Sequence, residues 1–112
     1  MSIKLNTEAV KQAERLIDAG EVETFDAQWN EEKPTADEVD HYINTHFMKE
    51  YGMWFLGKNA QYPDSAKEHY EYPYGDLKEV QRCALVDTIK RAEQSGHEEI
   101  VRAAKNLLHM IK

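Results

Sequence analysis

Residues 51–75 read YGMWFLGKNAQYPDSAKEHYEYPYG, and because the chain on either side looks helical, their conformation determines how the helices can pack. They include seven of the 11 aromatic residues of the chain: Tyr51, Trp54, Phe55, Tyr62, Tyr70, Tyr72 and Tyr74. Glycine and proline, which break long regular elements, interrupt the stretch at Gly52, Gly57, Pro63, Pro73 and Gly75. We therefore expect residues 51–75 to form an aromatic connector with fixed bends and a single short helix at 65–70.

Apolar residues recur at spacings of three and four over most of the remaining chain, which is the period of an amphipathic helix. The pattern predicts four main helices, at 7–19, 36–50, 77–94 and 98–111. Capping-box pairs precede the second and third helices, Thr35 with Glu38 and Asp76 with Glu79. The turn after Ser95-Gly96 is short, so the last two helices should close the fold as an antiparallel hairpin.

The expected fold class is all-α, with four main helices and one short helix. Val39, Ile43 and Phe47 form the predicted buried stripe of the second helix. The run Met53–Leu56 is apolar enough for a strand, but the sequence shows no second strand to pair with it. A chain of 112 residues and 13.0 kDa has the length of one domain, so we expect a single helical domain over 1–112.

Most of the charge of the chain lies in one short segment. The chain carries a formal net charge of −7, and residues 21–40, with eight acids and Lys33, have the same net charge. Residues 20–35 lack helical periodicity and are predicted to form an acidic loop. Acids in the first turn of a helix need no partner, because they interact with the helix dipole. Alternatively, Phe25 and Trp29 anchor an acidic docking segment, which would attract a basic partner and repel phosphate backbones and anionic lipids.

Nothing in the sequence indicates a membrane or an oxidising compartment. No run approaches the roughly 18 apolar residues that span a membrane, and the start, MSIKLNTEAV, lacks the features of a secretory signal. The single cysteine, Cys83, has no partner for an internal disulfide and falls in an apolar helix, where a buried thiol is expected. We therefore predict a cytoplasmic protein that does not bind membranes.

Residue spacing does not support a catalytic or metal site. His41 and His46 are five residues apart on a predicted helix, which places them on different faces. Asp37 and His41 are one turn apart, but a transition-metal site needs three or four ligands. The sequence has no nucleophile elbow and no phosphate-binding glycine loop. We expect no catalytic residues, no metal and no cofactor.

The aromatic connector is the strongest candidate for a binding site. Trp54, Phe55 and Leu56 can fill the core while the tyrosines lie half-buried. Alternatively, part of the cluster is exposed, because tyrosine and tryptophan give rigid contact area at low entropic cost. The predicted partner-binding residues are Trp54, Tyr62, Tyr70, Tyr72, Tyr74, Phe25 and Trp29. The alternative is a small-molecule pocket lined by Tyr70, Tyr72, Tyr74, His69 and Arg82.

Short motifs follow one another in a fixed order in the second half of the chain. They are W-F-L-G (Trp54 to Gly57), Y-P-Y-G-D (Tyr72 to Asp76), V-x-R-C-A-L (Val80 to Leu85), R-A (Arg91-Ala92) and A-A-x-x-L-L (Ala103 to Leu108). This order resembles a group of small uncharacterised bacterial proteins, some of them phage-related, that share a tryptophan motif, an aromatic turn and a closing helical hairpin. The resemblance covers about 51–110 and implies a recurring module. It transfers no catalytic residues, because no activity is assigned to that group.

The leading hypothesis is a non-catalytic module that binds another macromolecule, most simply a protein. Weak nucleic-acid binding through the C-terminal hairpin is a further alternative, which is disfavoured because Glu79 and other acids alternate with Lys78 and Arg82. As a core truncation, Trp54→Ala should destabilise the fold by about 3–5 kcal/mol. In contrast, Trp29→Ala should leave stability almost unchanged and weaken partner capture.

Overall fold

The aromatic connector contributes two strands to a sheet. The computed structural model of the protein describes residues 3–25 and 27–111. Strands β1 (Ile3–Leu5), β3 (Phe55–Asn59) and β4 (Tyr70–Pro73) form an antiparallel sheet in the order β1-β3-β4. In the central strand, Gly57 lies opposite Leu5 on one side and Glu71 on the other. The prediction of an all-α helical bundle is therefore wrong.

A second, smaller sheet ties the acidic segment to the rest of the molecule. Strand β2 (Val22–Glu23) pairs in parallel with β5 (Val80–Gln81), and the N–H of Val80 donates to the carbonyl of Glu21 at 3.0 Å. The short helix α2 (Trp29–Glu32) follows. The predicted acidic loop at 20–35 thus contains a strand and a helical turn, while its residue 26 lies outside the described residues.

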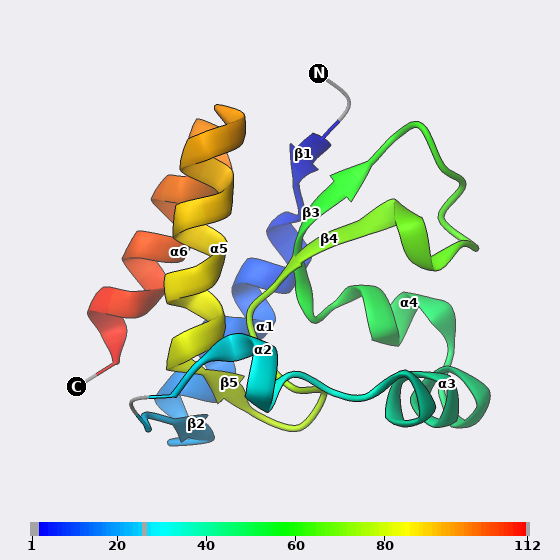
Figure 1. Cartoon of the computed structure of the whole chain (residues 1–112), viewed down its shortest axis with the longest axis horizontal. Coiled ribbons are helices and arrows are strands. Elements are labelled where there is room, and N and C mark those ends of the chain that lie inside the picture. The colour runs from blue at the N-terminus through cyan, green and yellow to red at the C-terminus, as the bar shows by residue number, and fades with distance from the viewer. Residues whose placement is uncertain (1–2, 26, 112) are drawn as a thin grey trace.

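The first helix and the last two helices lie close to where the periodicity predicts them. They are α1 (Thr7–Asp18), α5 (Arg82–Ser95) and α6 (Glu98–Met110). Gly96, with φ of 74°, ends α5 in the left-handed conformation that glycine adopts at little cost, and α6 then runs back beside α5 (Figure 1). Helix α5 starts later than predicted because the Asp76 carboxylate accepts bonds from the N–H groups of Lys78 and Glu79 and forms a turn.

The helix predicted at 36–50 is two helices, α3 (Ala36–Thr45) and α4 (Met48–Gly52). The predicted capping box at the start of α3 is present. At its end, the Thr45 hydroxyl and Nδ1 of His46 donate to the last carbonyls of α3, at 2.8 and 3.0 Å. Phe47 therefore lies outside the helix, and its prediction as a buried residue is wrong, because 79% of it is exposed. The short 3-10 helix η1 (Lys67–His69) replaces the helix predicted at 65–70.

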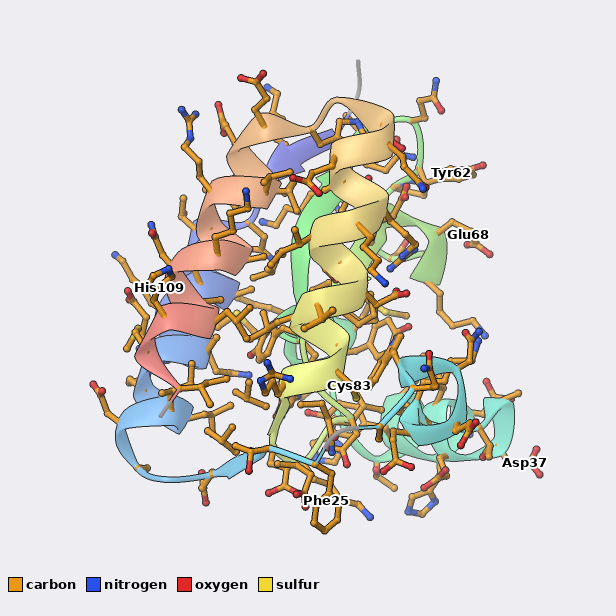
Figure 2. All side chains as sticks on the ribbon, turned by 60° about the vertical axis from the view of Figure 1, so that its left-hand side comes forward. Phe25, Asp37, Tyr62, Glu68, Cys83 and His109 are labelled. Atoms are coloured by element: carbon orange, nitrogen blue, oxygen red, sulfur yellow. The ribbon has the colours of Figure 1, made fainter. Side chains whose placement is uncertain are left out.

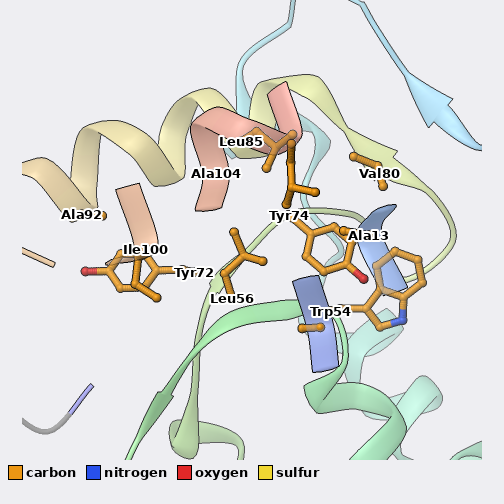
Figure 3. Packing of buried hydrophobic residues seen from close by; sticks show 12 residues of the cluster. Ala13, Trp54, Leu56, Tyr72, Tyr74, Val80, Leu85, Ala92, Ile100 and Ala104 are labelled. Carbon is orange, nitrogen blue, oxygen red and sulfur yellow. The ribbon is translucent and has the colours of Figure 1, made fainter. Parts of the chain in front are cut away.

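The core lies between the larger sheet and helices α1, α5 and α6 (Figure 1). Its large side chains come from the connector, β5 and the C-terminal helices, and include Trp54, Leu56, Tyr72, Tyr74, Val80, Leu85, Ile100 and Leu107. The rings of Trp54 and Tyr74 lie side by side, with centroids 5.4 Å apart (Figure 3). Most of the connector is therefore structural, which leaves only part of it for binding.

Candidate functional site

Three of the predicted binding residues in the connector are buried. Trp54, Tyr72 and Tyr74 belong to the core. The Tyr74 hydroxyl donates to the carbonyl of Met53 at 2.8 Å and accepts from Nε2 of Gln12 at 3.0 Å, and burial raises the pKa of Tyr74. The predicted groove with walls of Tyr70, Tyr72 and Tyr74 is therefore absent from the described part of the chain, because two of its walls are core residues.

The other connector residues form an open groove, which we call the connector groove. It has a volume of about 740 Å³, and its lining comes from α4, from β3 and from the chain that joins β3 to β4. Its polar and aromatic lining consists of Lys49, Lys58, Tyr62, Asp64, Ser65, His69 and Tyr70. The structure thus brings together three predicted residues, Tyr62, His69 and Tyr70, whereas Arg82 lies at the start of α5, outside this lining.

Local contacts hold the aromatic side of the connector groove in place. The Tyr70 hydroxyl donates to the carbonyl of Asp64 at 3.0 Å, and the Tyr70 ring packs so closely on Gly52 that a Cβ there would overlap it. Nδ1 of His69 lies 2.8 Å from the carbonyl of Tyr62. Because a carbonyl only accepts, Nδ1 carries the proton, and Nε2 is the second nitrogen of the ring. These contacts fix Tyr70 and His69 before any ligand binds.

A second groove lies between α3 and the turn that follows β4. It has a volume of about 370 Å³, and we call it the acidic groove. Its lining consists of Asp37, Glu38, His41, Tyr42, Thr45, His46, Asp76, Leu77 and Lys78. The Tyr42 and His46 rings stack with centroids 3.9 Å apart, and Leu77 has a φ of 71°, in the region that favours glycine. Both histidines line this groove, so the expectation that they face different sides is wrong: His46 follows the last residue of α3.

The acidic groove belongs to a larger acidic surface. We call residues 21–45 and the turn 76–79 the acidic end; β2, α2, α3 and β5 lie along one edge of the molecule in Figure 1. Burial, and then the nearby charges of Asp76, Glu23 and Glu21, raise the pKa of Glu79. Hydrogen bonds from Thr35 lower the pKa of Glu38. Asp76, Glu23 and Glu21 thus lie near enough to Glu79 for their charges to act on it.

The two predicted anchors of the acidic segment differ in burial. Phe25 is 67% exposed, as expected of an anchor, and lies at the opposite end of the molecule from Tyr62 (Figure 2). Trp29 is only 7% exposed and packs with Cys83 and Ala84 of α5. The expectation that Trp29 is a surface anchor without effect on stability is therefore wrong. Trp29 instead attaches the acidic segment to α5.

The predicted burial of Cys83 is confirmed. Burial, more than the nearby charge of Glu32, raises the pKa of its thiol, which is the opposite of what a nucleophile needs. In residues 3–25 and 27–111, no three His, Cys, Asp or Glu side chains are grouped so as to hold a metal ion. No helix within the described chain is both long and apolar enough to cross a membrane.

Sequence reasoning missed Phe47 as an exposed aromatic residue. Its spacing from Ile43 fits a helical stripe, and no glycine or proline indicates that α3 ends at Thr45. The only signal was the pair Thr45-His46, whose side chains can bond to helix carbonyls. Phe47 directly precedes Met48, which lines the connector groove.

Comparison of the chain with protein-family models, with curated protein sequences and with solved structures gives no match in any of the three. The resemblance to small bacterial proteins therefore stays a prediction, and the function must be inferred from the two grooves and their charges.

Proposed function

We propose that the protein is a small non-catalytic module that binds another protein, and that the acidic end receives a basic segment of that partner. The observation that carries the proposal is the acidic groove, in which the side chains of Tyr42 and Leu77 adjoin the carboxylates of Asp37 and Glu38. An arginine or lysine that stands next to an apolar residue fits this combination of charge and apolar surface.

The carboxylates of the acidic groove form no ion pair within the described residues. Among the described residues, the ion pairs are Lys67 with Asp40, Arg91 with Asp87 and Lys105 with Glu93. None of them involves a carboxylate of the acidic groove. A cation of the partner would therefore meet carboxylates that form no described ion pair, next to Lys78, the one lysine in the described lining of this groove.

The same charges disfavour nucleic acid as the partner. The acidic end repels phosphates, and two of the basic residues of the C-terminal hairpin, Arg91 and Lys105, pair with acids of α5. As part of the proposal we place the protein in the cytoplasm, which is supported by its one cysteine, Cys83, a free and buried thiol.

The test is fluorescence anisotropy with a labelled peptide of alternating arginine and leucine residues. The double variant Asp37→Asn, Glu38→Gln removes two charges from the first turn of α3, and Gln can keep the capping box. The matched control, Glu98→Gln, Glu99→Gln, removes two charges from the first turn of α6. We expect affinity to fall about tenfold in the first variant and less than about twofold in the control. Equal losses in both would mean general charge attraction and would contradict the proposal.

A further inference from the structure

We propose that the connector groove is a binding site for an aromatic phosphate monoester, a flat ring that carries a phosphate group. This inference does not depend on the proposed function, because the connector groove and the acidic groove have no lining residue in common. The sequence predicts a small-molecule pocket that includes Tyr70 and His69. We now place this pocket in the connector groove, which both residues line, and propose the class of its ligand.

Basic side chains predominate over acidic ones in the lining of the connector groove. Lys49 comes from α4 and Lys58 from β3, so two separate elements place ammonium groups along one groove of a protein whose net charge is −7. Neither lysine forms an ion pair with the described residues. Asp64 is the one carboxylate in the described lining, so cations outnumber anions. A phosphate monoester has a charge near −2, which matches two lysines. A ligand with one carboxylate group would carry only half of that charge.

The register of the sheet brings a second lysine next to Lys58. Lys58 lies directly opposite Lys4 of β1 and opposite Tyr70 of β4. Residues opposite each other in antiparallel strands are on the same face, with Cβ atoms about 5 Å apart, and like charges in this position are destabilising. The register thus places a second lysine on one side of Lys58 and a tyrosine on the other. A bound anion would relieve the repulsion, which points to an anionic ligand for this place.

The connector groove also has an aromatic surface, formed by Tyr62 and Tyr70. Tyr62 is 44% exposed, and the Tyr70 ring is fixed by its bond to the carbonyl of Asp64 and by its contact with Gly52. A fixed tyrosine offers a flat ligand a contact surface at little entropic cost. With Nδ1 of His69 bonded to the carbonyl of Tyr62, Nε2 is the ring nitrogen that remains for a polar group of the ligand.

The volume of the groove agrees with a ligand of this class. Small-molecule sites are typically about 300–1,000 Å³, and the connector groove has about 740 Å³. Both a nucleoside monophosphate and a phosphorylated phenol combine a ring with a phosphate. The two share the chemistry that the lysines and tyrosines recognise, and the experiment separates them.

The experiment is isothermal titration calorimetry of the full chain with adenosine monophosphate and with phenyl phosphate. Adenosine, phenol and inorganic phosphate serve as controls. The proposal expects binding of at least one of the two monoesters, and the tighter of the two identifies the ring. We expect adenosine, phenol and inorganic phosphate to bind at least about tenfold more weakly than the monoester. The reason is that the loss of a hydrogen bond to a charged group weakens binding by about tenfold. No binding of either monoester, or equal binding of inorganic phosphate, would overturn it.

Variants locate the site. Lys49→Gln and Lys58→Gln should each weaken monoester binding about tenfold, while Lys90→Gln, a change at an exposed lysine on α5, should leave it unchanged. Lys4→Glu is the sharpest variant, because it turns the like-charged pair with Lys58 into an opposite-charged one. It should raise the melting temperature and weaken monoester binding at the same time. Monoester binding that Lys49→Gln, Lys58→Gln and Lys4→Glu all leave unchanged would exclude the connector groove as the site.

Discussion

Replacement of Trp29 by alanine tests how the acidic segment is attached to the molecule. The sequence alone predicts almost no loss of stability, because Trp29 is surrounded by acids that look solvated. In the structure its ring is buried in a small cluster with Cys83 and Ala84. The variant Trp29→Ala therefore removes a packed aromatic side chain and leaves a cavity next to α5.

The expected loss follows from the burial of the ring. Truncation of a buried tryptophan costs about 3–5 kcal/mol. The lower end, about 3 kcal/mol, applies here because the cluster is small and α2 is short enough to relax toward the cavity. For a chain of this length that loss lowers the melting temperature by about 12 °C.

Urea denaturation and thermal melting followed by circular dichroism measure this loss. The matched control is Phe25→Ala in the same segment, which should change stability by less than about 0.5 kcal/mol because Phe25 is exposed. A Trp29→Ala variant as stable as the unmodified protein, or a Phe25→Ala variant that is equally destabilised, would refute the packing of α2 on α5.

Two further predictions concern buried and crowded polar groups. Tyr74→Phe should cost about 1–3 kcal/mol in urea denaturation, because it removes the hydroxyl bonds to Met53 and Gln12; an unchanged midpoint would show that these bonds are not formed. Burial and neighbouring acids raise the pKa of Glu79 above 4.5 in the folded state, so its contribution to stability grows as the pH falls. Glu79→Gln should therefore stabilise the fold at pH 7, and the gain should vanish below pH 4.5; a gain that persists in acid would exclude this electrostatic cause.

The sequence predicted those helices whose apolar residues, spaced three and four apart, are the ones that pack against the core. The apolar spacing in α1 and α6 and the glycine after α5 are local signals, and they gave the right elements. The sheet was missed because β1 and β4 are short and lie far apart in the chain. A signal was present: Tyr70, Tyr72 and Tyr74 occur at every second position, which is the period of a strand.

The candidate site depended on contacts that no local pattern reveals. The burial of Trp29 rests on Cys83 and Ala84, which come much later in the chain. Lys58 has a second lysine beside it only because β1 places Lys4 opposite it, and this requires the register of the sheet. The acidic charge, in contrast, could be read directly from the sequence, because it depends on composition alone.

The most direct test of the account is to map where a basic partner binds. Titration of the ¹⁵N-labelled protein with the arginine–leucine peptide should shift amide signals of Asp37 to His46 and of the turn from Asp76 to Lys78 more than all others. Shifts concentrated in α6, or the absence of any shift at millimolar peptide, would contradict the assignment of the acidic end as the recognition surface.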